Sequence, residues 1–262
     1  MELTYFQNIS PDPIYIPKVG SIVSPTLKDI SSIGENLYQT YLNVLLMDVE
    51  TFYKMEKRSE EYETLSDDKK IQLNIYDLFI NDANSVKLLE SALGFFIKED
   101  VLYENEYKAF AVRGNIVIKE QDEMVEKYLT VGIISKDNYH DVVNVICQRN
   151  NVKTKDVSST SKTKSKKALA IMQKLKRGRE SMAKVTKADK NMELGNIISA
   201  VANKSQSLNL VNIWDLTIFQ LWDSFARLTN NTIYDINAAS VSAWGDKDKK
   251  FDFNGWFKRL SD

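Results

Sequence analysis

The stretch "NIWDLTIFQLWDSFARL", residues 212–228, repeats large apolar side chains at the spacing of one helical face. Side chains three and four positions apart lie on the same side of an α-helix. The resulting stripe consists of Trp214, Ile218, Leu221, Phe225 and Leu228, and is widened by Phe219 and Trp222. The pattern predicts one helix over 212–228, with Trp214 and Trp222 facing a core of C-terminal helices.

The same spacing recurs on both sides of this stretch, and no proline follows Pro25. Proline is excluded from helix interiors, so its absence favours a predominantly helical chain. A turn is predicted at Asn230-Asn231, followed by a shorter helix. Further helices are predicted within residues 24–58, 65–82, 84–101, 122–132, 135–150, 166–185, 191–210 and 232–244.

Two regions depart from the helical pattern. All four prolines lie in residues 1–25, which predicts an extended Pro-rich N-terminal arm containing a short edge strand or a segment laid on a neighbour. The stretch "FAVRGNIVI" predicts a small β-hairpin near 109–118, with Gly114 supplying its tight turn. The predicted fold class is mainly α, with two helical domains, this hairpin and the arm.

Charge is distributed unevenly along the chain, although the net charge is only −1. Residues 1–151 hold 15 basic and 25 acidic side chains, whereas residues 152–190 hold 13 basic and 3 acidic ones. Residues 151–167 are rich in Ser, Thr and Lys, a composition typical of a mobile linker. The predicted domains are an arm (1–25), an acidic helical domain (26–150), a basic flexible linker (151–167) and a C-terminal helical domain with an aromatic tail (168–262).

The basic segment, residues 153–190, allows two interpretations. Basic runs usually form a solvated face, or they fold onto an acidic partner such as the first half of this chain. The alternative is a weak, non-specific and salt-sensitive nucleic-acid contact, because clustered cations neutralise phosphates. The basic residues of this segment have no aromatic side chains between them on which bases could stack. The candidates for this contact are Lys162, Lys164, Lys166, Lys167, Lys174, Lys176, Arg177 and Arg179.

The sequence contains no recognisable catalytic, cofactor-binding or metal-binding constellation. His140 and Cys147 are the only residues of their types, so a zinc-like ligand set cannot form, and we expect Cys147 to be buried and His140 to lie at a helix edge. No glycine-rich phosphate loop is present. No secretory signal or membrane-spanning run is apparent, and the lone cysteine suits a reducing compartment. We therefore expect a protein that is not an enzyme and requires no cofactor.

The aromatic C-terminal tail is the candidate for binding a protein partner. All four tryptophans lie between Trp214 and the chain end, and the tail follows a polar run that gives its rings little assured burial. Aromatic side chains are frequent anchors at interfaces. The alternative is simple packing onto the C-terminal helices. The tail candidates are Phe251, Phe253, Trp256 and Phe257.

The segment "IWDLTIFQLWDSF" (213–225) and the terminal "DFNGWF" (252–257) resemble the C-terminal part of phage tail-module proteins. In particular, the last 70 or so residues are similar to tail assembly chaperones and baseplate-hub assembly proteins of large phages infecting Gram-positive hosts. The resemblance implies a late, non-enzymatic assembly factor or minor structural protein that binds tail or baseplate subunits. It implies a place in the host cytoplasm during assembly, with the virion tail or baseplate as the alternative. The client and the oligomeric state stay open.

Overall fold

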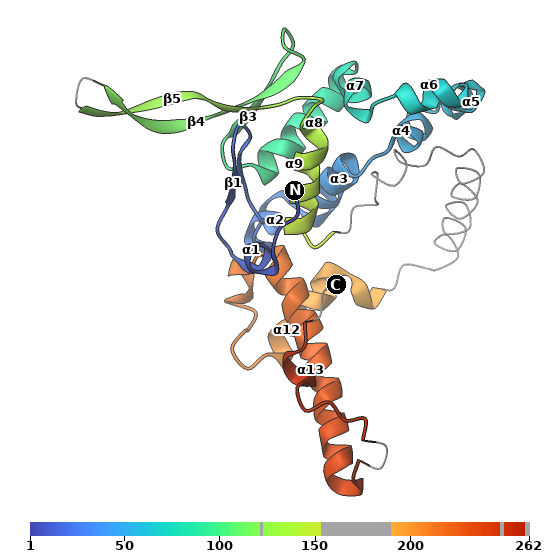
Figure 1. Ribbon diagram of the computed structural model, residues 1–262, viewed down its shortest axis with the longest axis vertical. Helices are drawn as coiled ribbons and strands as arrows, with labels where there is room; N and C mark the ends of the chain where they lie inside the picture. Colours follow the sequence, from blue (N-terminus) through green and yellow to red (C-terminus); the bar gives the residue numbers. More distant parts are fainter. Residues whose placement is uncertain (121–122, 153–189, 247–248, 260–262) are drawn as a thin grey trace. The chain divides into compact units, whose positions relative to one another are not determined.

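The computed structural model describes residues 1–120, 123–152, 190–246 and 249–259 (Figure 1). The chain forms two compact units, Met1–Thr154 and Lys155–Asp262. Nearly all of the predicted linker, 151–167, and the predicted helix within 166–185 lie outside the described residues.

Unit 1 combines helices with two antiparallel sheets, so the described fold is mixed α/β and the prediction of a mainly α fold is wrong. One sheet pairs β1 with β2, and the other has the strand order β3-β4-β5. The strands are β1 (Ile14–Ile16), β2 (Gly20–Ile22), β3 (Asp100–Glu104), β4 (Ala109–Glu120) and β5 (Glu123–Ile134). The helices are α1 (Tyr5–Ile9), α2 (Leu27–Ile33), α3 (Glu35–Leu45), α4 (Val49–Met55), α5 (Ser59–Thr64), α6 (Asp67–Gln72), α7 (Ile75–Ile80), α8 (Ala83–Phe96) and α9 (Tyr139–Arg149).

The predicted extended arm is wrong, because residues 1–25 fold as part of unit 1. A capping box at Thr4 starts α1, and the hairpin β1–β2 follows. The prolines are compatible with this hairpin because they lie outside its strands, with Pro17 in the turn, where no ladder donor is lost. Ile22 is fully buried, and the backbone N–H of Val23 donates to the Phe96 carbonyl over 2.9 Å.

The predicted hairpin turn at Gly114 is also wrong, as is the helix predicted within 122–132. Strand β4 continues through Gly114 and pairs with β5 along its whole length, from Phe110↔Ile134 to Glu120↔Glu123. The spacing of apolar residues in β5 suits a helix locally, but cross-strand pairing with β4 overrides that preference. Gly114 instead leaves room for the side chain of Glu99, because a Cβ on residue 114 would lie 2.9 Å from Cγ of Glu99.

The core of unit 1 forms where helices α3, α8 and α9 bury their apolar faces with the sheet. The helices predicted within 84–101 and 135–150 are confirmed as α8 and α9. Leu89, Leu93 and Phe96 of α8 are fully buried. The long helical stretch predicted within 24–58 is divided into α2, α3 and α4, with a break at Gly34, whose φ of 86° ends α2.

Helix α8 begins directly after its capping residue, Asp82. The Asp82 carboxylate accepts a hydrogen bond from the Ser85 backbone N–H over 2.7 Å, and this bond lowers the pKa of Asp82. Asp82→Ala is expected to lower the free energy of unfolding by about 1 kcal/mol at neutral pH. Because the folded-state pKa is depressed, the cap stabilises above the unfolded pKa and is lost as the pH falls through the folded one. Denaturant unfolding at neutral and acidic pH checks this, and an equal loss at both would contradict it.

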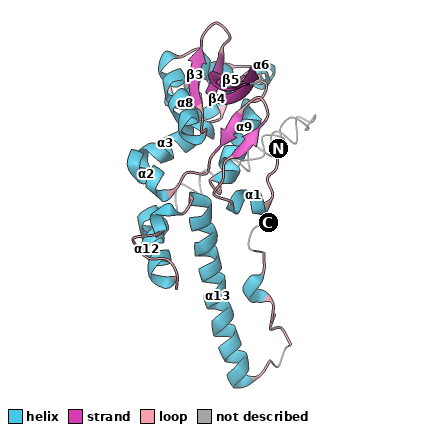
Figure 2. Cartoon of the chain, turned by 90° about the vertical axis from the view of Figure 1, so that its left-hand side faces the viewer, coloured by secondary structure: helices cyan, strands magenta, loops and turns pink. Residues whose placement is uncertain are grey.

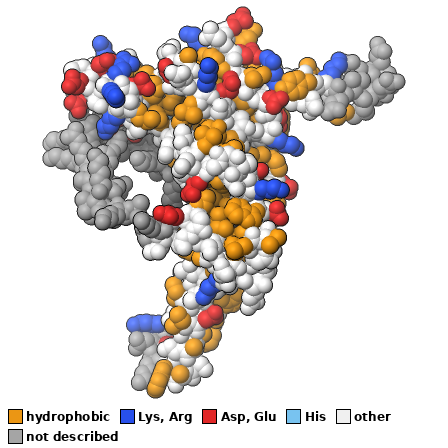
Figure 3. Space-filling view, turned by 180° about the vertical axis from the view of Figure 1, so that it is seen from behind, with side chains coloured by type: hydrophobic (Ala, Val, Ile, Leu, Met, Phe, Trp, Pro, Cys, Tyr) orange, Lys and Arg blue, Asp and Glu red, His pale blue; other side chains and the backbone are white. Residues whose placement is uncertain are grey.

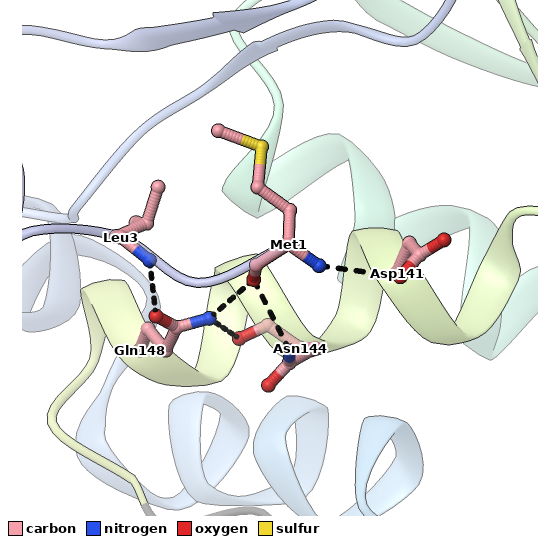
Figure 4. Close-up of polar contacts among 5 residues, drawn as sticks. All are labelled: Met1, Leu3, Asp141, Asn144 and Gln148. Atoms are coloured by element: carbon pink, nitrogen blue, oxygen red, sulfur yellow. Dashed lines mark hydrogen bonds and ion pairs between the residues drawn. The ribbon is translucent and has the colours of Figure 1, made fainter.

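The first residues of the chain lie along α9 through polar contacts (Figure 4). The Leu3 backbone N–H donates to Oε1 of Gln148 over 2.8 Å, and Nε2 of Gln148 donates to the Met1 carbonyl over 3.0 Å. Nδ2 of Asn144 donates to the same carbonyl, and the Met1 amino group pairs with Asp141 over 3.4 Å. These contacts fix residues 1–3 on one face of α9.

The side chain of Arg149 secures the rest of this N-terminal segment. Arg149 is fully buried, and its guanidinium donates to the backbone carbonyls of Gln7, Asn8, Ser10 and Asp12. Burial lowers the pKa of Arg149, and the Asp12 carboxylate opposes that shift. The end of α1 and the chain leading to β1 are therefore organised around one cation.

Unit 2 contains η1 (Lys190–Met192), α12 (Leu194–Lys204), η2 (Ile213–Asp215), α13 (Ile218–Trp244) and η3 (Gly255–Phe257). The helix predicted within 191–210 is confirmed as α12, which buries Ile197 and Val201. Among the described residues, no helix is both long enough and apolar enough to cross a membrane.

The helix predicted over 212–228 starts later than predicted and runs further. A capping box at Thr217 begins α13, which continues through the predicted turn at Asn230-Asn231 to Trp244. Trp214 lies on η2 instead, where its Nε1 donates to the Leu210 carbonyl over 2.9 Å. The buried residues of this region are Ile213, Thr217, Ile218, Phe219 and Leu221, whereas Trp214 and Trp222 are half-buried.

Candidate functional site: the C-terminal clasp

The end of α13 reverses the chain direction. Gly245 ends the helix with a φ of 76°, and its N–H donates to the Val241 carbonyl over 2.8 Å. The Asp246 carboxylate then accepts hydrogen bonds from the backbone N–H groups of Lys250 and Phe251, over 3.0 and 2.9 Å. Residues 249–259 consequently return alongside α13 (Figure 2).

Three side chains of α13 hold the returning segment by its backbone carbonyls. Nη1 of Arg227 donates to Lys258 over 2.8 Å, and Nδ2 of Asn230 donates to Gly255 over 2.9 Å. The Tyr234 hydroxyl donates to Phe253 over 3.2 Å. Spacings of three and four place the three donors on one face of the helix. We call residues 249–259 together with Arg227, Asn230 and Tyr234 the C-terminal clasp.

The clasp presents aromatic side chains to solvent. Phe251 is half-buried between the rings of Tyr234 and Phe253, with centroid distances of 5.4 and 4.9 Å. Trp256 and Phe257 contact each other edge to face at 4.9 Å. The exposed rings of this region, which we call the aromatic surface, are Trp244 (80% exposed), Phe253 (71%), Trp256 (55%) and Phe257 (55%).

An open groove of about 740 Å³ lies between α13 and the clasp segment. Its walls include Tyr234, Val241 and Trp244 from the helix and Phe251 and Gly255 from the segment. A Cβ on Gly255 would lie 3.4 Å from the Tyr234 ring, which is an ordinary van der Waals contact, so the segment packs against this ring without requiring glycine. Polar side chains such as Asn237, Ser240 and Asp252 also line the groove, so it offers a partner both aromatic rings and hydrogen-bonding groups.

The predicted site residues fall into three groups. Phe253, Trp256 and Phe257 are exposed, as a docking role requires, whereas Phe251 packs within the clasp. All eight predicted nucleic-acid residues, Lys162 to Arg179, lie outside the described residues. The sequence interpretation did not include Trp244 among the tail candidates, although an aromatic ring just before the charged run 246–250 was an available signal.

His140 and Cys147 lie in different environments. Cys147 is fully buried in α9, and burial raises the pKa of its thiol to about 12, whereas His140 is exposed. Cys147 is therefore a protonated core side chain at neutral pH. Within the described ranges, no three His, Cys, Asp or Glu side chains gather as metal ligands would.

Residues 186–261 match a family model described as the YomV second domain, a Bacillus phage-associated family. No curated protein and no solved structure matches the chain. The matched residues include α12, α13 and the clasp, so the candidate site lies within a domain similar to a phage-associated one.

Proposed function

We propose that this chain is a phage protein that acts by binding other phage proteins, with tail or baseplate subunits as its partners during assembly. The observation that carries the proposal is the aromatic surface, in which four large rings are more than half exposed. Exposed aromatic side chains on a soluble protein are costly unless a partner covers them, and they are frequent interface anchors.

The clasp supports this role because it fixes the rings before a partner arrives. Three side-chain hydrogen bonds and the Asp246 carboxylate hold the backbone of the segment that carries Phe253, Trp256 and Phe257. A preorganised surface loses less conformational entropy on binding than a free tail would. The proposal therefore concerns a shaped docking surface and involves no chemical reaction.

The alternative function is nucleic-acid association through the basic segment, residues 153–190. Its support is the charge imbalance of that part of the sequence. Under that alternative, partner capture would depend on nucleic acid and would be indifferent to the aromatic surface.

The test replaces Trp256 and Phe257 together by Ala in the full chain. Capture of phage proteins from producing cells is expected to fall at least about tenfold, because two interface anchors are lost. The matched control replaces Phe6 and Tyr107 by Ala, two rings of unit 1 that are 80% and 69% exposed. This control variant should capture phage proteins as the unaltered chain does. Circular dichroism and thermal unfolding should be unchanged in both variants. Full capture by the Trp256→Ala/Phe257→Ala variant would refute the role of the surface, and a marked loss of thermal stability would show that the rings serve packing.

A further inference from the structure

The groove between α13 and the clasp segment continues beyond the last hydrogen bond of the clasp. The helix face that carries Asn230 and Tyr234 extends through Asn237, Ser240 and Trp244 at spacings of three and four residues. All five side chains line the groove, whose volume is about 740 Å³. Clefts that bind small ligands commonly measure about 300–1,000 Å³. The groove therefore has the size of a ligand site.

Two uncharged polar side chains of the groove have no partner within the described part of the chain. Asn237 and Ser240 are exposed, and neither side chain takes part in a hydrogen bond there. The Thr229 hydroxyl of the same helix behaves differently, because it donates to the Phe225 carbonyl over 2.9 Å. An amide and a hydroxyl group can each donate and accept hydrogen bonds. These two side chains are therefore free to bind a ligand that also does both.

Aromatic rings supply the apolar part of the groove. Trp244, in the last turn of α13, is 80% exposed. The rings of Tyr234 and Phe251 also line the groove, and their mutual contact at 5.4 Å fixes them. The face of an aromatic ring is electrically negative and attracts groups that carry a partial positive charge. The C–H groups of a pyranose sugar are of this kind, because each of the ring carbons is bonded to oxygen.

The charged side chains around the groove balance one another. Asp246 and Asp252 are matched by Lys250 and Lys258, so these four give no net charge. The Asp246 carboxylate is already engaged by the backbone N–H groups of Lys250 and Phe251. Charged side chains are also few in the lower part of Figure 3, between hydrophobic and uncharged polar ones. A polyanion or polycation would gain little attraction from such a surface, which favours a neutral ligand.

We propose that this groove binds a neutral oligosaccharide, with one pyranose ring stacked on Trp244 and its hydroxyl groups hydrogen-bonded to Asn237 and Ser240. A pyranose presents C–H groups on its faces and hydroxyl groups at its edge, which matches an aromatic ring beside an amide and a hydroxyl. A protein anchor would instead require a well-packed, fully desolvated pocket, whereas this groove is open and partly polar. Of the four rings of the aromatic surface, only Trp244 lines the groove, so this inference goes beyond the proposed function and can fail separately.

The first test titrates the full chain by calorimetry with three neutral tetrasaccharides: cellotetraose, maltotetraose and tetra-N-acetylchitotetraose. At least one of them is expected to bind with a Kd of about 1 mM or lower. Its affinity should be the same at low and high salt, because no ionic contact contributes to binding. The absence of binding by all three at about 10 mM, or an affinity that falls steeply with salt, would overturn the proposal.

Trp244→Ala and Asn237→Leu test the stacking and the hydrogen bonding separately. Each is expected to raise the Kd for the saccharide about tenfold or more. Both residues are exposed, so circular dichroism should not change. The matched control is Trp256→Ala, which removes an exposed ring outside the groove and should leave the Kd for the saccharide unchanged. Unchanged saccharide binding by Trp244→Ala, or an equal loss in Trp256→Ala, would contradict the proposed site.

The same variants distinguish saccharide binding from the capture of phage proteins. The Trp256→Ala/Phe257→Ala variant is expected to lose protein capture and to keep saccharide binding, whereas Asn237→Leu should do the reverse. If Asn237→Leu instead lost protein capture and no saccharide bound the unaltered chain, the groove would belong to the protein interface and the saccharide proposal would be wrong.

Discussion

Replacing Arg149 by Met is expected to lower the free energy of unfolding by about 3–5 kcal/mol. The guanidinium is fully buried and donates to four backbone carbonyls between Gln7 and Asp12. Methionine keeps much of the side-chain volume but donates no hydrogen bond. The four carbonyls, which belong to half-buried or exposed residues, would lose this donor, and a partly buried acceptor without a donor is costly.

Arg149→Lys separates the contribution of the positive charge to stability from that of the planar guanidinium and its hydrogen bonds to the four carbonyls. Lysine retains the positive charge but presents a single ammonium in place of a planar fork, so an intermediate loss is expected. Denaturant unfolding measures the stability of each variant, and hydrogen exchange of residues 1–12 shows whether the N-terminal segment is released. If Arg149→Met lowered the free energy of unfolding by less than about 1 kcal/mol, the hydrogen bonds of Arg149 would contribute little to stability.

The second large effect is expected for Gly132→Ala in β5. The Ile133 backbone N–H donates to the Lys18 carbonyl over 2.9 Å, which brings the β1–β2 turn directly against the strand. A Cβ on residue 132 would lie 2.6 Å from both the carbonyl carbon and the oxygen of Val19. Backbone atoms cannot move aside as a flexible side chain can, so we expect a loss of about 2–4 kcal/mol.

Gly94→Ala is the matched control for this substitution. Gly94 lies within α8 of the same unit, and nothing lies within 4 Å of the Cβ it would gain. Alanine there should stabilise the helix by up to about 1 kcal/mol. Thermal unfolding of both variants checks the contrast. Equal stability of the two would show that the turn and β5 are not in close contact in solution.

The sequence predicted those elements whose signal is local. Helices α8, α9 and α12 each bury one apolar face, and their spacing is visible within a single stretch. Strand β5 was mistaken for a helix because Met124, Val125, Tyr128 and Leu129 also fit helical spacing. Its pairing with β4 is decided between strands, and neither segment alone contains that information. Arg149 was missed for the same reason, since its partners are backbone carbonyls 137 to 142 residues away.

Part of the candidate site was predictable and part was not. The composition of the tail indicated Phe253, Trp256 and Phe257 as exposed rings. The clasp was not predictable, because Arg227, Asn230 and Tyr234 bind carbonyls 31, 25 and 19 residues further along the chain. Every residue at the chain end has a backbone carbonyl that could accept such a hydrogen bond, so the sequence does not indicate which ones do.

The proposed function requires that this chain binds other phage proteins. Its most direct test is affinity purification of the full chain from phage-producing cells, divided into nuclease-treated and untreated halves and analysed by absorbance and mass spectrometry. We expect tail or baseplate proteins to co-purify equally in both halves. Nucleic acid in the untreated half, with all protein partners lost after nuclease treatment, would contradict it and assign function to the basic segment.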